Sequence, residues 1–187
     1  THNRGNGAAF AVEELRPLTD VARAHGLAVH LDGARIFNAA VALGVPAAEL
    51  ASVADSVTFC LSKGLGCPVG SLLCGSAETI AKARKWRKVL GGATRQAGIV
   101  AAPGIVALET MIDRLAEDHS NARKLARGLN EIPGFSIDAE RVETNLVFVD
   151  VSVQSATELV RKLADNGVYV GPRDPAATKW RMVTRYG

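Results

Sequence analysis

The side chain best placed to do chemistry is a lysine within residues 62–66, which read Ser-Lys-Gly-Leu-Gly. Lys63 follows an apolar run over residues 57–61 and precedes a glycine-rich turn, where a buried strand would end and a loop would open. Burial favours the neutral amine of a lysine over its ammonium form, and a neutral amine can attack a carbonyl carbon to form a Schiff base. A surface lysine at a strand end would have the same local sequence, so this stretch alone leaves both interpretations open.

A carboxylate occurs 31 residues before this lysine, at the end of another short apolar run. In apolar surroundings the carboxylate of Asp32 needs a cation or a hydrogen-bond donor. Arg35 could be that cation in a purely structural salt bridge. Alternatively, Asp32 faces a bound cation such as a protonated pyridine nitrogen, and Lys63 forms a Schiff base to the same aromatic cofactor. The two side chains would then hold opposite ends of one ring.

Alternating helices and strands must position these two residues. We expect helices over residues 11–25, 34–43 and 47–53, and strands over residues 27–31, 57–61 and 69–74. Such alternation is typical of a parallel or mixed sheet covered by helices on both faces. Ligands bind at the carboxyl ends of the strands in these sheets, and Asp32 and Lys63 both follow the carboxyl end of an expected strand.

The pattern changes in the second half of the chain. We expect helices over residues 77–89, 97–111, 114–129 and 156–166, and strands over residues 144–151, 168–171 and 180–185. We therefore predict an α/β chain with a boundary near residue 112. Residues 1–112 would form an α/β part with a mixed or parallel sheet, and residues 113–187 a small α+β unit.

Composition excludes several classes of function. The 187 residues can bury a sizeable core, and 22% charged with 48% hydrophobic residues is typical of a soluble globular protein. A net charge of +3 without a basic run, and only 5% aromatic residues, argue against nucleic-acid binding. The apolar stretch over residues 97–108 is too short to cross a membrane and is interrupted by Pro103.

The cysteines indicate a reducing environment. Their number is odd and low, which argues against a disulfide framework, and no signal peptide is visible, so we expect a cytoplasmic protein. Their spacing matches no zinc motif, so we predict no metal site and expect three buried small hydrophobes. These residues are Cys60, Cys67 and Cys74. The chain begins at Thr1 in a polar stretch and stops at Gly187 after a strand-like run, so we expect a fragment of a longer protein, lacking its N-terminal part.

Several motifs occur in the order found in the threonine aldolases. They are residues 1–3, 30–35 (His-Leu-Asp-Gly-Ala-Arg), 62–66, 84–88, 91–98, 118–122 and 181–184. The chain therefore resembles these pyridoxal-phosphate enzymes of the aspartate-aminotransferase-like fold, the transferase fold of type I. The resemblance implies that residues 1–112 are the C-terminal part of the large α/β/α domain that binds the cofactor, and that residues 113–187 are the small C-terminal α+β domain. The resemblance implies retro-aldol cleavage of L-threonine or L-allo-threonine to glycine and an aldehyde, with pyridoxal 5'-phosphate as the cofactor. It implies a homodimer or homotetramer and a small amino acid as substrate.

The same resemblance implies roles at matching positions. Lys63 would form the Schiff base and Asp32 would pair with the pyridinium nitrogen, so these two are the predicted catalytic residues. Ser62 and Arg35 would also contact the cofactor.

Basic side chains would bind the substrate. Arg35 and Arg181 would bind its carboxylate, since an arginine fork matches a carboxylate bidentately. Lys88 and Arg95 match positions that reach the active site of a neighbouring subunit. Cys67, Ala93 with Thr94, and Arg185 depart from the usual family residues, which bears on substrate preference more than on reaction type.

Other interpretations remain open. A β-eliminating lyase or an aminotransferase of the same fold would share Lys63 and Asp32, and a non-catalytic fragment would keep the motifs without the activity. Among the histidines, we interpret His30 as a core residue, His119 as structural and His2 as a loop residue. No side chain stands out as the catalytic base.

Overall fold

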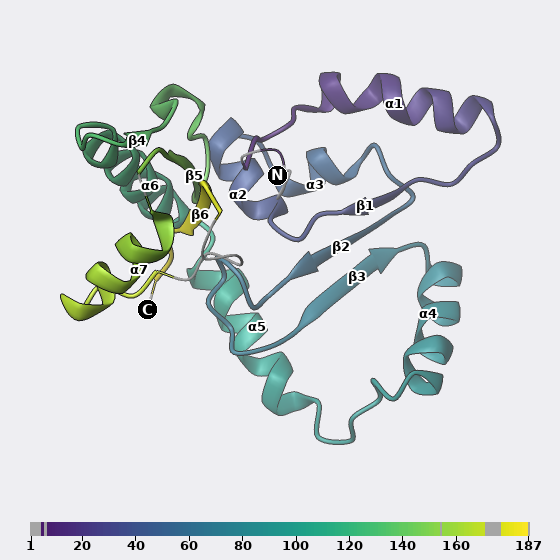
Figure 1. Ribbon diagram of the computed structural model, residues 1–187. Coiled ribbons are helices and arrows are strands. Elements are labelled where there is room, and N and C mark those ends of the chain that lie inside the picture. Colours follow the sequence, from purple (N-terminus) through teal and green to yellow (C-terminus); the bar gives the residue numbers. More distant parts are fainter. Residues whose placement is uncertain (1–4, 6, 154, 171–176, 187) are drawn as a thin grey trace.

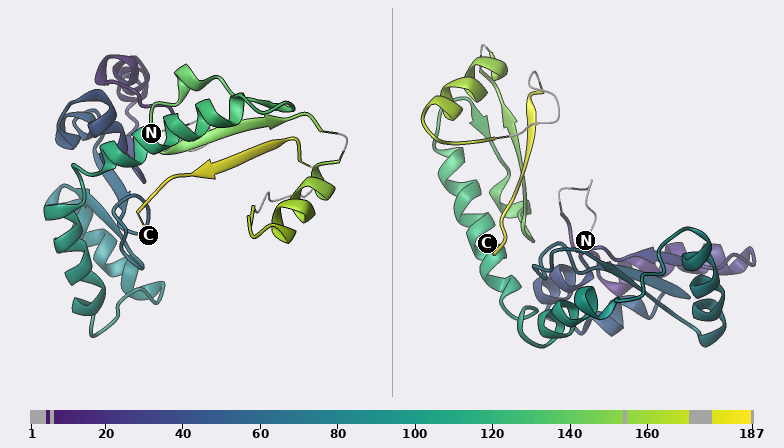
Figure 2. Two further views of the ribbon diagram at one scale, coloured as in Figure 1. Left: turned by 90° about the vertical axis from the view of Figure 1, so that its left-hand side faces the viewer. Right: turned by 90° about the horizontal axis from the view of Figure 1, so that it is seen from below.

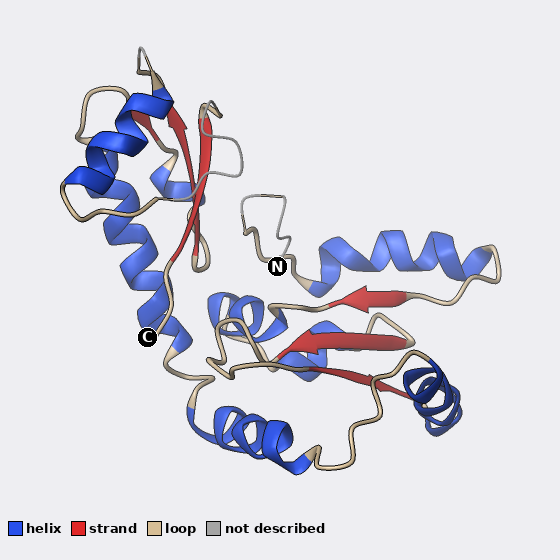
Figure 3. Ribbon diagram, turned by 60° about the horizontal axis from the view of Figure 1, so that its bottom comes forward, coloured by secondary structure: helices blue, strands red, loops and turns tan. Residues whose placement is uncertain are grey.

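The computed structural model describes residues 5, 7–153, 155–170 and 177–186. Two three-stranded sheets organise this part of the chain, with the strand orders β1-β2-β3 and β4-β5-β6. Figures 1 and 3 show the sheets as two separate groups of strands, each with its own helices. We call residues 12–110 the first region and residues 115–183 the second region.

The first sheet is mixed. Its strands are β1 (His30–Asp32), β2 (Ser56–Cys60) and β3 (Ser71–Gly75). Strands β1 and β2 are parallel, with Asp32 opposite Thr58, whereas β3 runs antiparallel to β2, with Ser71 opposite Cys60. The carboxyl ends of β1 and β2 therefore lie at one edge, and β3 carries the chain back to the other.

Five helices belong to the first region. They are α1 (Val12–Ala24), α2 (Ile36–Leu43), α3 (Ala47–Ala51), α4 (Ala77–Val89) and α5 (Gly98–Thr110). Helix α2 is strongly apolar and packs its buried face into the core, and it ends at Gly44, whose φ of 70° is a left-handed conformation that glycine adopts without strain. The core side chains of this region include Ile36, Leu50, Phe59 and Leu61.

The second region is a helix-covered antiparallel sheet. Its elements are α6 (Leu115–Asn130), β4 (Phe135–Ser136), the short 3-10 helix η1 (Ala139–Arg141), β5 (Leu146–Val151), α7 (Ala156–Asp165) and β6 (Lys179–Val183). Strand β5 lies in the centre, and α6 packs along it (Figure 2). The buried side chains Val147, Val149 and Trp180 form the centre of this second core.

Residues at the start of the chain tie the regions together. The Thr144 hydroxyl donates a hydrogen bond to the carbonyl of Gly7 (2.7 Å), and the Ala9 amide donates to a carboxylate oxygen of Glu143 (2.7 Å). A Cβ on Gly7 would lie 2.8 Å from Cβ of Leu146, so only glycine fits there. The segment before α1 therefore lies against the start of β5, the central strand of the second sheet.

The structure corrects some expected boundaries. The strand expected over residues 27–31 is His30–Asp32, so Asp32 lies within the strand. No strand forms over 168–170, the described part of the strand expected at 168–171. Tyr169 is 85% exposed there. Residues with strand-like side chains gain little from an extended conformation when no neighbouring strand packs beside them, which accounts for the missing strand. The short elements β4 and η1 were not expected. No described helix combines the length and apolar character needed to cross a membrane.

Candidate functional site

The turn after β2 fixes the place of Lys63. Its ammonium or amine nitrogen Nζ donates a hydrogen bond to Sγ of Cys60 (2.8 Å), and the side chain is half-buried. The Gly66 amide donates to the carbonyl of Lys63 (2.9 Å), and Gly66 has a φ of 75°. The Cys67 amide closes the loop by donating to the carbonyl of Leu61 (3.1 Å). The glycine-rich turn thus folds back on the strand end and directs the lysine toward the sheet edge.

Asp32 ends the neighbouring parallel strand. One carboxylate oxygen accepts a hydrogen bond from the Ala34 amide (3.1 Å), and the residue is exposed. A Cβ on Gly33 would lie 2.9 Å from the carbonyl oxygen of Thr58, so the chain after β1 can approach β2 this closely only at a glycine. The carboxyl ends of β1 and β2 therefore bring Asp32 and Lys63 to the same edge of the sheet.

Arg35 is buried beside this edge, with 8% of its surface exposed. Burial lowers the pKa of its guanidinium, the positive charge of Arg181 lowers it further, and Cys60 acts in the opposite direction. Arg181 lies opposite Phe148 in the second sheet. Arg35 therefore lies within electrostatic range both of Arg181, from the other region, and of Cys60, the partner of Lys63.

The other predicted site residues lie elsewhere. Ser62 is exposed beside Lys63. Lys88 belongs to the last turn of α4, and Arg95 to the loop before α5; both are exposed. Because β3 is antiparallel, α4 begins at the end of the sheet opposite Lys63 (Figure 1). Lys88 and Arg95 thus do not join the cluster within this chain, and their predicted reach into a neighbouring subunit stays a prediction.

Several side-chain interpretations from the sequence need correction. His30 is exposed at the amino end of its strand, where its Nδ1 is 2.9 Å from the Ser56 hydroxyl, so it is not a core residue. Of the three cysteines, only Cys67 is buried; Cys60 is half-buried and Cys74 is exposed. His2 lies outside the described residues.

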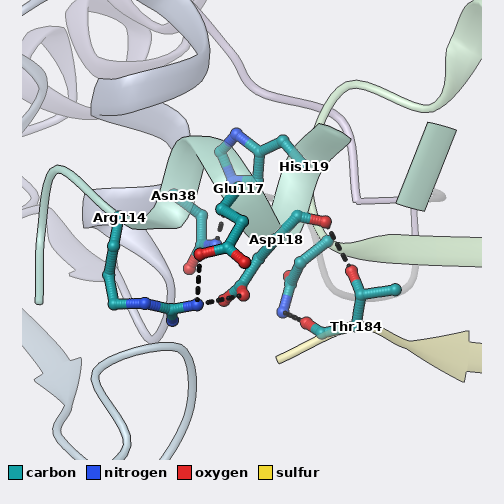
Figure 4. A network of polar contacts seen from close by, with 7 residues as sticks. Asn38, Arg114, Glu117, Asp118, His119 and Thr184 are labelled. Atoms are coloured by element: carbon teal, nitrogen blue, oxygen red, sulfur yellow. Dashed lines mark hydrogen bonds and ion pairs between the residues drawn. The ribbon is translucent and has the colours of Figure 1, made fainter. Parts of the chain in front are cut away.

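A polar network at the junction of the regions was not expected from the sequence. Asn38 on α2 and His119 on α6 are in contact, and Arg114, Glu117, Asp118 and Thr184 continue the network (Figure 4). Asn38 could have been identified from the sequence as a buried polar residue in need of a partner, because it is the only polar residue within the apolar sequence of α2.

A cavity of about 470 Å³ lies beside the first sheet, between α1, β1 and α2. Its lining is mostly apolar and includes Asp32 and Gly33 but not Lys63. A second hollow of about 630 Å³ lies between the turn at residues 65–68 and α5, with Tyr186 at its rim. Neither space is lined by both Asp32 and Lys63. The side chains at the sheet edge, rather than the size of a cavity, therefore indicate the chemistry.

Comparison with known proteins gives consistent similarities. Residues 1–154 match the family model described as Beta-eliminating lyase. The chain is 44% identical over 171 residues to the low-specificity L-threonine aldolase 1 of Arabidopsis thaliana, which covers 90% of this chain and 48% of that protein. The chain thus spans about half the length of the curated relatives it matches.

Solved structures show the same architecture. A protein from Exiguobacterium sp. 255-15, described as an aromatic amino acid beta-eliminating lyase/threonine aldolase, superposes with a TM-score of 0.85 at 26% identity over 98% of this chain and 54% of its own. A PLP-dependent aminotransferase from Streptococcus suis 89-1591 has a TM-score of 0.66 at 18% identity, covering 96% of this chain and 49% of its own. The second likeness concerns the fold alone, and it is the type I fold of PLP enzymes.

Proposed function

Because the chain belongs to the beta-eliminating lyase family, we propose that its protein cleaves β-hydroxy-α-amino acids such as L-threonine or L-allo-threonine into glycine and an aldehyde. The observation that carries the proposal is the gathering of an amine, a carboxylate and two guanidinium groups around one sheet edge. Those four side chains are Lys63, Asp32, Arg35 and Arg181.

The donor set fits pyridoxal 5'-phosphate. Lys63 would hold the cofactor covalently through its amine, Asp32 would pair with the ring nitrogen, and Ser62 would contact the cofactor beside the lysine. When bound, the cofactor supplies an electron-accepting ring for the pair released by the breaking Cα–Cβ bond. The carboxylate of Asp32 favours the protonated ring nitrogen, because an opposite charge nearby favours the charged form of a base.

Arg35 and Arg181 would bind the carboxylate of the amino acid. Two guanidinium groups close together repel each other, and Arg35 is also largely removed from water. A carboxylate relieves both penalties, since it neutralises the pair and accepts hydrogen bonds from a planar fork of donors. The arrangement therefore favours an anionic substrate group at the edge that carries Lys63.

A β-elimination is the second candidate reaction, because the matched family model bears that name. It would use the same covalent lysine and the same carboxylate-binding arginines. The products separate the two reactions: cleavage of threonine gives glycine and an aldehyde, whereas elimination gives ammonia and a keto acid.

We also propose that the protein works as a homodimer or homotetramer in which Lys88 and Arg95 extend toward a neighbouring subunit. The apolar residues of α4 and of the turn after it support this: Trp86 is 59% exposed, Val89 65% and Leu90 80%. Sedimentation equilibrium would test it, with Trp86→Glu expected to shift the mass toward the monomer and Ala81→Glu, elsewhere on the same helix, as the control. An unchanged mass for Trp86→Glu would contradict this interface.

The first test of the reaction mixes the chain with pyridoxal phosphate and reduces the mixture with borohydride. We expect a permanent cofactor label on Lys63, mapped by peptide mass, and no label at that position in Lys63→Ala. Lys82→Ala, which removes an exposed lysine in a salt bridge with Glu78, should leave the label in place. Release of glycine from L-threonine is then measured. Reduction without a label on Lys63 would contradict the proposed function, and a keto acid product would favour elimination.

A further inference from the structure

The turn that carries Lys63 packs directly against the junction of the two regions. Gly64 is buried, and a Cβ at this position would lie 2.8 Å from Cδ2 of Leu115 and 3.0 Å from Oδ1 of Asn38. Leu115 opens α6 and is fully buried. The residue next to the lysine therefore touches both the Asn38 amide and the first turn of α6, with no room for a side chain between them.

Asn38 is held in turn by His119. The side-chain nitrogen Nδ2 of Asn38 lies 3.1 Å from Nε2 of His119, and these residues are only 2% and 3% exposed (Figure 4). An amide nitrogen can only donate, so Nε2 accepts and the imidazole is neutral with its proton on Nδ1. Burial, and secondarily the charge of Arg123, lower the pKa of His119 to about 4, which keeps the accepting form at neutral pH.

The neighbouring residue on α6 holds the strand that carries Arg181. The Thr184 hydroxyl donates a hydrogen bond to the backbone carbonyl of Asp118 (2.6 Å), and the Asn145 side chain donates to the carbonyl of Thr184 (2.9 Å). Thr184 directly follows β6, three residues after Arg181. Residues 118 and 119 of α6 thus connect to α2 on one side and to the end of β6 on the other.

We propose that Asn38 and His119 are positioning residues for the reaction proposed above: their hydrogen bond fixes the Lys63 turn, through Gly64, relative to the strand of Arg181. Neither side chain touches a proposed reacting group. The amine of Lys63, which would hold the cofactor, and the guanidinium of Arg181, which would hold the substrate, belong to different regions. This buried hydrogen bond fixes the position of one relative to the other. The proposal rests on the proposed function only in taking Lys63 to hold the cofactor and Arg181 to hold the substrate.

The test compares variants that keep or remove the accepting atom. In His119→Gln the amide oxygen can take the place of Nε2, whereas His119→Leu leaves no acceptor for Asn38. Val149→Ala is the control for loss of stability, because Val149 is fully buried in the second sheet and away from the junction. Should His119→Leu fail to fold, Asn38→Ser, whose hydroxyl is too short to reach the imidazole, provides the same comparison.

The readout is the reactivity of Lys63 toward formaldehyde and cyanoborohydride, mapped by peptide mass and divided by that of the exposed Lys82 in the same sample. We expect this ratio to rise in His119→Leu, because a turn that is no longer held against α6 exposes the half-buried amine of Lys63 more fully to the reagent. His119→Gln and Val149→Ala should match the wild type. Equal ratios in His119→Leu and the wild type, or equal changes in His119→Gln and His119→Leu, would overturn the proposal.

The reagent separates this inference from the proposed function, because formaldehyde labels an amine without any cofactor. Labelling with pyridoxal phosphate and borohydride is run in parallel on the same variants. If the formaldehyde labelling ratio of Lys63 depends on His119, the positioning role is supported, whether or not pyridoxal phosphate labels the wild type. Absence of the pyridoxal label on the wild type would count against the proposed function alone.

Discussion

The two sheets differ in how completely they are covered. In β5 the side chains of Leu146, Val147 and Val149 have no exposed surface, whereas every residue of β3 is exposed, with Leu72 at 38%. Yet Lys63, Asp32 and Arg35 belong to the first region, and only Arg181 comes from the second. The region that holds most of the proposed chemistry is thus the one whose sheet is less completely covered. We infer that burial contributes more packing energy per residue in the second sheet than in the first.

The sharpest test of this comparison truncates one leucine in each sheet. Leu146→Ala should lower the free energy of unfolding by about 3 kcal/mol, because it removes buried methyl groups and leaves a cavity. Leu72→Ala should lower it by less than about 1 kcal/mol, since that side chain already contacts water. Urea unfolding followed by the fluorescence of the buried Trp180 measures both. Similar losses in the two variants would mean that the sheets do not differ in this way.

The pH dependence of stability tests the junction between the regions. His119 has an ordinary pKa of 6.5 when unfolded and about 4 when folded, so between these values the unfolded chain binds the extra proton. Its contribution is therefore fully present above pH 6.5 and is lost as the pH falls to about 4, amounting to about 3 kcal/mol. Unfolding midpoints in urea across this range measure the loss.

A glutamine variant isolates the histidine from its neighbours. Burial raises the pKa of the Asp118 carboxyl, against the opposing effect of Arg114, which gives a slope of the opposite sign; Glu117 and Arg123 also face this site. His119→Gln keeps all four of these groups and removes only the imidazole titration. The free energy of unfolding of the wild type minus that of the variant should fall by about 3 kcal/mol from pH 6.5 to pH 4. A constant difference would show that His119 is not buried in its neutral form.

The packing of the Lys63 turn predicts a smaller effect. Gly64→Ala should cost about 2 kcal/mol, because its methyl group must displace Leu115 or the Asn38 amide. Gly128→Ala on the open face of α6 is the matched control, with nothing within 4 Å of the added Cβ, and should stabilise by up to about 1 kcal/mol. Thermal unfolding compares the two. A neutral Gly64→Ala would show that the turn is not pressed against α6.

The smallest effect concerns the thiol beside the lysine. Cys60→Ala removes the acceptor of the Lys63 hydrogen bond and should change the stability by less than about 1 kcal/mol. It should nevertheless alter the share of Lys63 labelled by formaldehyde, while Cys60→Ser, which keeps an acceptor, should alter it less. Cys74→Ala, an exposed cysteine on the neighbouring strand, serves as the control. Identical labelling in all four proteins would show that the thiol does not hold the amine.

Local pattern was sufficient for some features. An apolar run that ends in a polar residue and glycine marks a strand end at Asp32 and at Lys63, and most helices follow from apolar spacing. The burial of a strand was harder to predict from the sequence. Residues 71–75 have the composition of a covered strand, yet all of them are exposed. The contact between Asn38 and His119 joins residues 81 positions apart, and no local pattern encodes such a pairing. Residues 168–170 were wrongly expected to form a strand for the same reason, because no local pattern shows whether another strand lies alongside.

The nearness of Arg35 to Arg181 has a thermodynamic consequence. Each guanidinium belongs to a different region, so an anion bound by both acts as a non-covalent cross-link between them. Any ligand that binds only the assembled state stabilises it, by about 2.7 kcal/mol at a concentration 100 times its dissociation constant. By the same linkage, a carboxylate loses affinity whenever the two regions separate. Occupancy by such an anion and cohesion of the fold would thus be two measures of a single equilibrium.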